Sequence, residues 1–313
     1  MKHTRDGFNL AIRRFGLFGL LLIFTTSCAS ETKDLDAGIT TTSAEPTASA
    51  TATVASTATT TTAADVPVAS LDPAAGAQVF PPPAGGAGSA PIPLVVLVPG
   101  GGWVEADPSG LVPLARELSS RGAFVATVTY RTAGEEAYFP TPVHDIACGV
   151  AFATASDTDA GFQASELIIV GHSSGAQLAA ALALSDIGNA ANCEFEYSDP
   201  DRLVGLAGPY DVVRASGLAH SLFGPDNPDS AKWSAGDPMQ LAANRPQMPV
   251  LLVHGLSDDV VPTWFTEQFA AALEDGGHGV TALYPDRADH FSIFSAELAG
   301  PIIAEWLGLD ADG

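Results

Sequence analysis

The hydrophobic residues of this chain gather in short unbroken runs, separated by glycine-rich turns and by helical segments. Runs of four or five apolar residues are too short for helices and are typical of strands buried on both faces of a parallel sheet. Such strands are predicted at 94–98, 124–128, 167–170, 203–207, 250–253 and 280–284, with one or two edge strands within 66–79. Helices are predicted at 111–121, 142–154, 263–273 and 293–307, and directly after Gly175. This alternation predicts an α/β fold with a doubly wound, mainly parallel sheet flanked by helices.

The run at 167–170 leads through Gly171-His172-Ser173-Ser174-Gly175 into a segment rich in alanine and leucine. A G-x-S-x-G pattern between a strand and a helix is typical of a nucleophile elbow, in which the glycines leave room for a sharp turn. The serine is then exposed at the helix N-terminus, where the helix dipole favours negative charge. A plain strand–turn–helix connection with a capping serine would give the same pattern, so the choice depends on the rest of the site.

The other chemically active residues also follow strands of the predicted sheet. In an open parallel sheet the ligand lies beyond the carboxyl ends of the strands, because the strand-to-helix loops meet there. The residues that come directly after a strand are Gly100–Gly102, Ser173, Asp211, Asp258 and His290. We therefore expect all of them at one edge of the sheet.

A serine hydroxyl becomes a nucleophile only when an imidazole accepts its proton, and a carboxylate must fix the tautomer of that imidazole. His290 follows the last strand, whereas His278 precedes that strand and belongs to the opposite edge. The sequence therefore predicts Ser173 as the nucleophile and His290 as the base.

Asp258, at the tip of the loop after the strand 250–253, is predicted to be the acid that orients this base. Its neighbour Asp259 and the earlier Asp211 remain alternatives, since both lie at the same edge. If Asp211 is not catalytic, it is expected to hold a turn by accepting backbone N–H groups. Asp145, in the first turn of a predicted helix, is expected to be structural.

Acyl transfer also needs N–H donors directed at the oxyanion of the tetrahedral intermediate. Gly101 and Gly102 are predicted to supply two of them and the backbone of Ser174 a third, because glycine lets the main chain approach a substrate. Trp103 is either a wall of the substrate pocket or part of the core under this loop, and Tyr210 is a second candidate for substrate contact. No G-x-G-x-x-G or GKS/T frame fits the glycines, which disfavours a nucleotide site.

The start of the chain predicts export. Basic residues precede a short apolar run at 15–24, which is the size of a signal-peptide core. Residues 1–28 are expected to be a signal peptide of the lipoprotein type with lipidation at Cys28; cleavage after Ala29 would instead give a soluble secreted protein. Residues 29–65 are mostly Thr, Ala and Ser and are expected to be a disordered tether, which leaves 66–313 as the catalytic domain.

The composition agrees with export. The three cysteines of the chain include Cys148 and Cys193, an even pair once Cys28 is set aside, and these two are predicted to form a disulfide. A formal charge of −23 disfavours nucleic acid and anionic membranes as partners, so the only membrane contact expected is through the lipid anchor. No spacing of histidines and cysteines indicates a metal, and no cofactor is expected.

From about Leu94 onward the chain resembles the α/β-hydrolase superfamily, and within it the esterases and lipases near the hormone-sensitive-lipase, carboxylesterase and feruloyl-esterase-like (BD-FAE) groups. The motifs that carry the resemblance are VLVPGGGW, VTYR, GHSSGAQLA, HGLSDDVVP and ADHF. Pro99 stands where those families usually have a histidine, and Asp289 stands where they have a small residue. The large lid domains of the family are absent, so only residues 212–249 could cover the site.

These features predict an exported serine hydrolase that cleaves small-molecule carboxylic esters through Ser173, His290 and Asp258. The alternatives are an amide or peptide hydrolase with the same residues, and a lipid-tethered binding module without catalysis. The sequence contains no information on the natural ester or the oligomeric state.

Overall fold

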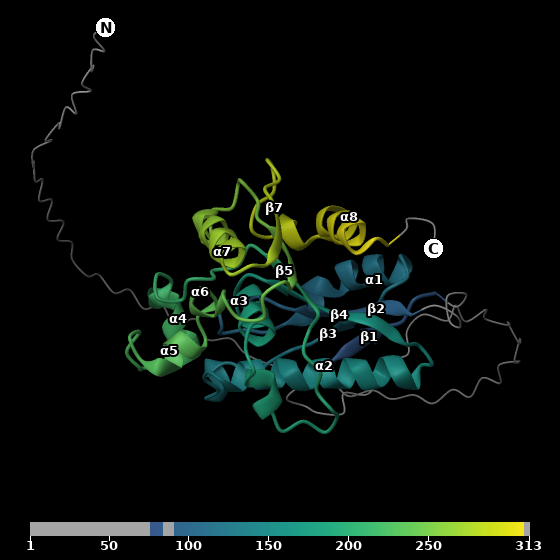
Figure 1. Ribbon diagram of the computed structural model, residues 1–313, viewed down its shortest axis with the longest axis horizontal. Coiled ribbons are helices and arrows are strands. Elements are labelled where there is room, and N and C mark those ends of the chain that lie inside the picture. Colours follow the sequence, from purple (N-terminus) through teal and green to yellow (C-terminus); the bar gives the residue numbers. More distant parts are fainter. Residues whose placement is uncertain (1–75, 84–90, 310–313) are drawn as a thin grey trace, which may run out of the picture. The chain divides into compact units, whose positions relative to one another are not determined.

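The strands form one sheet in the described part of the chain. The computed structural model describes residues 76–83 and 91–309 (Figure 1). The predicted signal peptide at 1–28 and the predicted tether at 29–65 lie outside the described residues. The sheet has seven strands in the order β1-β3-β2-β4-β5-β6-β7. Their bounds are β1 Gln78–Phe80, β2 Ile92–Val98, β3 Phe124–Thr127, β4 Ala164–His172, β5 Arg202–Leu206, β6 Pro249–Val253 and β7 Gly279–Leu283.

The order of the strands determines where the site can form. Only β1 is antiparallel to its neighbour β3, and every other pair is parallel. The chain runs from β2 outward to β3 and then returns to place β4 on the other side of β2. The connections after β2 and β4 therefore diverge, which opens a crevice at the carboxyl ends of these two strands. The predicted doubly wound, mainly parallel sheet is confirmed.

Both faces of the sheet are covered, and this explains the unbroken apolar runs. In β2, Leu94, Val96 and Val98 belong to one core, which contains side chains of α2, α3 and α7. Val95 and Leu97 belong to a second core, to which α1 and α8 contribute. These five side chains have no exposed surface. Burial on both sides removes the polar–apolar alternation of a half-exposed strand.

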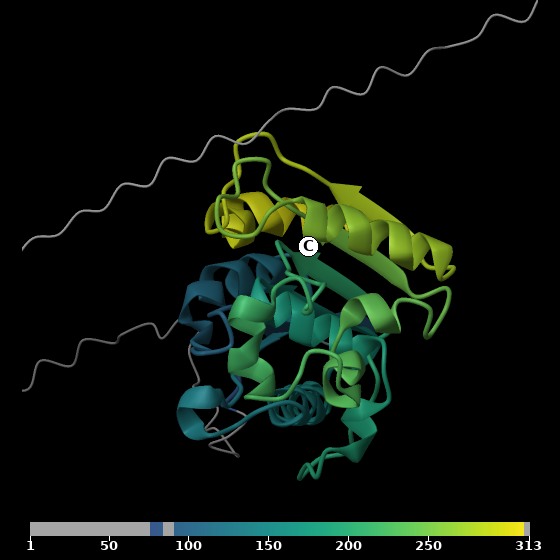
Figure 2. The same cartoon turned by 90° about the vertical axis from the view of Figure 1, so that its left-hand side faces the viewer.

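The helices lie in two layers, with α1 and α8 on one face of the sheet and α2 on the other (Figures 1 and 2). The α-helices are α1 Val112–Ser120, α2 Thr141–Asp159, α3 Ser174–Ala183, α4 Ser216–Phe223, α5 Ala231–Ala235, α6 Pro238–Leu241, α7 Trp264–Asp275 and α8 Ala296–Leu307. Short 3-10 turns are η1 Pro108–Leu111, η2 Ala133–Glu135, η3 Ile187–Ala190 and η4 Ser292–Phe294. Within the described ranges, no helix has the length and apolar character needed to cross a membrane.

Two predicted segments are divided into shorter helices in the structure. The closing helix predicted at 293–307 is divided into η4 and α8, because Ser295 is extended (φ −64°, ψ 152°) and its side chain caps α8 by accepting the N–H of Leu298. The irregular segment 212–249 contains α4, α5 and α6, of 8, 5 and 4 residues. Helices this short carry no periodic apolar stripe that a sequence pattern could reveal.

The disulfide predicted from the sequence is present between Cys148 and Cys193. Cys148 lies in α2, and Cys193 lies in the loop after η3. The bond therefore joins the helix before β4 to the segment after α3. One cysteine precedes the elbow in the sequence and the other follows it.

Replacing Cys148 and Cys193 together with serine is expected to lower the free energy of unfolding by about 2–4 kcal/mol. The bond closes a loop with a sequence separation of 45, which restricts the unfolded chain. Urea unfolding of the oxidised wild type, the reduced wild type and the double variant measures the effect. A double variant as stable as the oxidised wild type would show that the bond contributes nothing.

Candidate active site

The elbow between β4 and α3 holds Ser173 in a backbone conformation that few residues adopt. Its φ is 53° and its ψ is −126°, between His172 at the end of β4 and Ser174 at the start of α3. A side chain at Gly171 would collide with the carbonyl oxygen of Gly175, and one at Gly175 would collide with that of Pro99. The two glycines are therefore required by close backbone contacts, and the strained serine is a feature that proteins retain at functional sites.

Ser173, His290 and Asp258 form a continuous series of hydrogen bonds. The Ser173 Oγ lies 2.9 Å from His290 Nε2. The other ring nitrogen, Nδ1, lies 2.8 Å from Asp258 Oδ2. Because a carboxylate can only accept, Nδ1 carries the proton and Nε2 is left to accept the serine hydroxyl. This is the tautomer that a general base for Ser173 needs.

Asp258, and not Asp259, faces the imidazole. The Oδ1 of Asp258 accepts the N–H groups of Val260 and Val261 at 2.9 and 2.8 Å, and its side chain has no exposed surface. Burial alone would raise the pKa of Asp258, but the hydrogen bonds from His290, Val261 and Val260 hold the pKa below its ordinary value. Asp259 is exposed. The geometry thus assigns the carboxylate behind the ring to Asp258.

His254 supports this carboxylate, a role that the sequence analysis did not assign. Its Nε2 lies 2.8 Å from the carbonyl oxygen of Val261 and 3.2 Å from Asp258 Oδ2. Since a carbonyl oxygen can only accept, Nε2 carries the proton, and Nδ1 accepts the Thr266 hydroxyl at 2.7 Å. Burial lowers the pKa of His254 and favours this neutral form. His254 thereby fixes the loop that carries Asp258.

His172 supports the base in a similar way. Its Nε2–H donates to the backbone oxygen of His290 at 2.8 Å, and its ring packs between those of His290 and Phe294. Burial and the nearby His290 lower the pKa of His172 to about 3, so this ring stays neutral at ordinary pH. A side chain at Gly100 would lie only 2.9 Å from His172 Nδ1, which explains the need for glycine there.

The glycine loop after β2 turns sharply beside the elbow. Gly101 and Gly102 have φ values of 133° and 61°, a region that favours glycine. Both residues line the same cavity as Ser173 and Ser174. The N–H of Ser174 opens α3 and so has no partner within the helix. The residues predicted to supply the oxyanion donors therefore line the same cavity as Ser173.

Tyr130, from the VTYR motif, links the glycine loop to the elbow. Its hydroxyl donates to the carbonyl oxygen of Pro99 at 3.2 Å and lies 3.5 Å from Ser174 Oγ. Burial raises the pKa of Tyr130 to about 12, so the hydroxyl keeps its proton. Pro99 thus has a backbone contact where the related families carry a histidine side chain. No local sequence pattern could reveal this contact, because the two residues lie in the loops after two different strands.

The candidates for substrate contact differ in their position. Trp103 lines the cavity and also packs in the core, with its Nε1 donating to Gln177 Oε1 at 2.9 Å. The prediction that Tyr210 contacts the substrate was wrong. Tyr210 is fully buried, stacks on Phe269 and does not line the cavity. Its ring lies over Gly205 and Gly208, where an added side chain would collide with it. The cavity wall is formed instead by the preceding residue, Pro209.

Asp211, Asp145 and His278 have structural contacts and lie apart from the hydrogen bonds of Ser173. Asp211 accepts the N–H of Arg214 at 2.9 Å and pairs with its guanidinium at 3.3 Å, which holds the turn after β5. Asp145 binds Arg131 through both carboxylate oxygens. His278 precedes β7, and its Nδ1 lies 3.3 Å from the carbonyl oxygen of Met248, at the opposite edge from Ser173.

Asp289 stands where the related families have a small residue. Hydrogen bonds from Ser292 and Phe291 lower the pKa of Asp289, because they stabilise its charged form. Asp289 therefore fixes the turn that presents His290. Among the described residues, no three His, Cys, Asp or Glu side chains gather as a metal would require.

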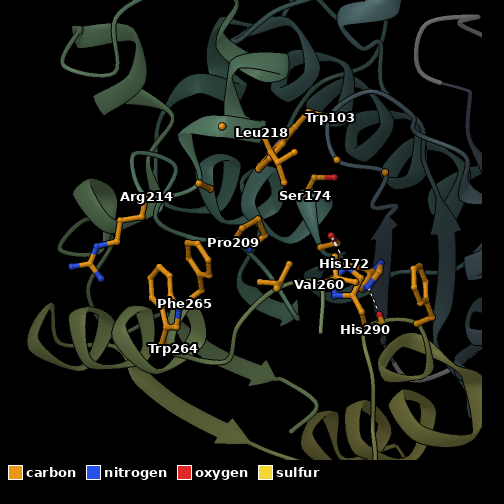
Figure 3. Close-up of a pocket in the computed structure, with 17 residues that line it drawn as sticks. Trp103, His172, Ser174, Pro209, Arg214, Leu218, Val260, Trp264, Phe265 and His290 are labelled. Atoms are coloured by element: carbon orange, nitrogen blue, oxygen red, sulfur yellow. Dashed lines mark hydrogen bonds between the residues drawn. The ribbon is translucent and has the colours of Figure 1, made fainter. Parts of the chain in front are cut away.

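A cavity of about 520 Å³ opens over the Ser173 hydroxyl. Its walls come from the glycine loop, the elbow, the segment 209–218, the start of α7 and Phe291. Figure 3 shows Ser174, His172 and His290 on one side of it, with Arg214, Trp264 and Phe265 at the end away from His290. A volume of this size accommodates a small-molecule ligand.

Comparison with known proteins identifies the family of this chain. The BD-FAE family model matches residues 82–273, a stretch that contains Ser173 and Asp258 and ends before His290. The esterase LipQ of Mycobacterium tuberculosis is 26% identical over 230 residues, which are 68% of this chain and 53% of that protein. The chain thus spans about half the length of this relative.

Solved structures share the fold. A truncated carbohydrate esterase from gut microbiota aligns with a TM-score of 0.63 at 18% identity, over 74% of this chain and 89% of that one. The esterase Est2 of Thermogutta terrifontis, with butyrate bound, aligns with a TM-score of 0.60 at 19% identity, over 76% and 91% of the two chains. At these identities the likeness is one of fold.

Proposed function

This chain belongs to the BD-FAE family of α/β-hydrolases, and on that basis we propose that it is a serine hydrolase that cleaves carboxylic esters. The relatives named above are esterases by their descriptions, which supports the same reaction class here. The observation that carries the proposal is the hydrogen-bonded series from Ser173 Oγ through His290 to Asp258 at the floor of the cavity.

In the first half of the proposed reaction, the Ser173 oxygen attacks the ester carbonyl while His290 Nε2 takes the hydroxyl proton. The carbonyl oxygen becomes an oxyanion, which accepts hydrogen bonds from the N–H groups of Gly101, Gly102 and Ser174, three residues that line the cavity. Asp258 holds the imidazole in place and stabilises the imidazolium that forms. The bond to the alcohol then breaks, and the leaving alkoxide takes the proton from His290 Nε2. Ser173 is left acylated.

In the second half, water replaces the alcohol. His290 Nε2 takes a proton from the water as its oxygen attacks the acyl carbon, and the same donors bind the second oxyanion. The bond from the acyl carbon to Ser173 Oγ breaks, and the serine oxygen recovers its proton from His290. The products are a carboxylic acid and an alcohol, and the enzyme returns to its starting state. The proton that passes between Ser173 Oγ and His290 Nε2 follows a hydrogen bond of 2.9 Å.

We further propose that the protein is exported and held at the outer face of the cell membrane by a lipid on Cys28. The charged and apolar pattern at 1–28 supports the export signal, and the Cys148–Cys193 disulfide supports an oxidising compartment. Small-molecule esters are the proposed partners. Mass spectrometry of the mature N-terminus distinguishes acylation at Cys28 from cleavage after Ala29.

A fluorophosphonate probe is expected to label the wild-type protein and to leave Ser173→Ala unlabelled. Such probes react with a serine oxygen only where a base and oxyanion donors activate it; the 2.9 Å contact from Ser173 to His290 and the glycine loop in the same cavity support this reactivity. Ser109→Ala, at an exposed serine bonded to Asp107, is the matched control and should label fully. Labelled peptides identified by mass spectrometry locate the adduct.

Three outcomes separate the candidate functions. Label at Ser173 with turnover of p-nitrophenyl acetate supports the esterase. Label with turnover of an aminoacyl anilide, and none of the ester, would assign the site to amide or peptide cleavage. Folded protein that takes no label would favour a binding module and would contradict the proposal.

A further inference from the structure

The cavity beyond the Ser173–His290 pair is lined mainly by apolar side chains. Its walls include Pro209, Leu218, Val260, Val261 and Phe265. The indole nitrogen of Trp103, which could have met a substrate hydroxyl, already donates to Gln177. A sugar hydroxyl placed against these side chains would lose its hydrogen bonds to water without a replacement partner, which is unfavourable. The walls therefore select against polyhydroxylated groups.

The single cationic side chain that lines the cavity, within the part of the chain described, is already committed elsewhere. Arg214 pairs with Asp211 at 3.3 Å, donates to Gln268 at 2.8 Å and lies 5.2 Å over the ring of Trp264. Its charge is therefore balanced by a carboxylate. The hydrocarbon part of the Arg214 side chain and the ring of Trp264 therefore extend the apolar wall.

The mouth of the cavity exposes large apolar side chains from three separate segments. Leu218 on α4 is 66% exposed, Val260 before α7 is 51% exposed, and Phe291 after the base is 66% exposed. Exposed apolar groups that converge on one opening mark a site that an apolar ligand covers. Figure 3 shows Leu218 and the Trp264–Phe265 pair on opposite sides of Pro209, so this opening leads into a cleft with two apolar sides.

We propose that the enzyme selects esters with an extended apolar group of about four to eight carbons, which lies in the cleft between Leu218 and the Trp264–Phe265 pair. Acetyl esters of carbohydrates are then poor substrates. The inference rests on the proposed ester hydrolysis and adds the class of substrate to it. Leu218 is the residue that determines this preference, because it borders the cleft and is not buried in the core.

Two homologous series of substrates test the proposal: p-nitrophenyl esters from acetate to octanoate, and n-alkyl acetates from methyl to octyl. Burying a methylene group contributes about 0.8 kcal/mol, which corresponds to about a fourfold rise in kcat/KM for each carbon. We expect a rise approaching this value in at least one series, and a lower kcat/KM for an acetylated xyloside than for p-nitrophenyl hexanoate.

The variant Leu218→Asn keeps the size of the side chain and makes it polar. In the series whose kcat/KM rises with chain length, it is expected to lower kcat/KM for the octyl or octanoyl member by about tenfold and that for the shortest member by less than twofold. Leu283→Asn is the matched control, since Leu283 is 38% exposed on β7, outside the cavity, and should change neither value.

Failure of the proposed substrate preference can be distinguished from failure of the proposed ester hydrolysis. Flat or falling values of kcat/KM along both series, with p-nitrophenyl acetate still cleaved, would overturn the inference and leave ester hydrolysis standing. The same is true if Leu218→Asn lowered kcat/KM equally for the shortest and the longest member of the series that rises. No turnover of any ester and no fluorophosphonate label would overturn the proposed function itself.

Discussion

Replacing Ser173 with alanine is expected to lower kcat for p-nitrophenyl acetate by on the order of 10⁵–10⁶-fold while the protein remains folded. The variant keeps the cavity and the oxyanion donors, so binding and some rate enhancement over water persist. The reaction loses the only oxygen that lies 2.9 Å from His290 Nε2 in this site. Alanine retains the Cβ, so the backbone strain at φ 53° and the thermal unfolding temperature should change little.

His290→Ala and the double variant give the sharper test. Groups that act as one unit have strongly non-additive effects, so the double variant should lose hardly more activity than Ser173→Ala alone. His278→Gln serves as the control, because His278 lies at the opposite edge of the sheet and should leave kcat within twofold of wild type. Losses that multiply, or a loss on His278→Gln that equals that of His290→Ala, would mean that the base has been misidentified.

The central residues of the site could be predicted from the sequence because each one follows a strand. The carboxyl ends of parallel strands lie at one edge of the sheet. Ser173, Asp258 and His290 could therefore be assigned to one site without any measured distance. The same rule excluded His278, which the structure places at the other edge. The apolar runs identified the strands because burial on both faces leaves no polar alternation.

The supporting contacts could not be predicted because they depend on side-chain directions across long sequence separations. His172 bonds the backbone of a residue 118 positions away, and Tyr130 contacts Pro99 from the loop after the neighbouring strand β3. The error at Tyr210 has the same cause: its place after β5 was correct, but its ring turns inward over two glycines. Which side of the backbone a loop residue faces is a property of packing that local patterns do not encode.

Asp258→Asn is expected to lower kcat by on the order of 10⁴-fold, whereas Asp259→Asn should leave kcat within about twofold of wild type. The carboxylate requires a proton on His290 Nδ1, which leaves Nε2 free to accept from Ser173. An asparagine amide can donate to Nδ1, and the ring then carries its proton on Nε2 and cannot act as a base. The side-chain oxygen of asparagine can still accept the N–H groups of Val260 and Val261.

The pair of variants is a matched comparison, since both remove one negative charge from adjacent positions of the same loop. Loss of charge alone would therefore change kcat equally in the two variants. Only Asp258→Asn also loses the carboxylate contact to His290, so a difference in kcat reports that contact. Steady-state rates with p-nitrophenyl acetate, together with urea unfolding of each variant, distinguish a catalytic defect from an unstable loop. Equal losses of kcat, or a larger loss on Asp259→Asn, would contradict the assignment, because Asp259 is exposed and makes no contribution to the buried series of hydrogen bonds. A tautomer selected by one buried carboxylate is thus the physical condition on which the whole proposed reaction depends.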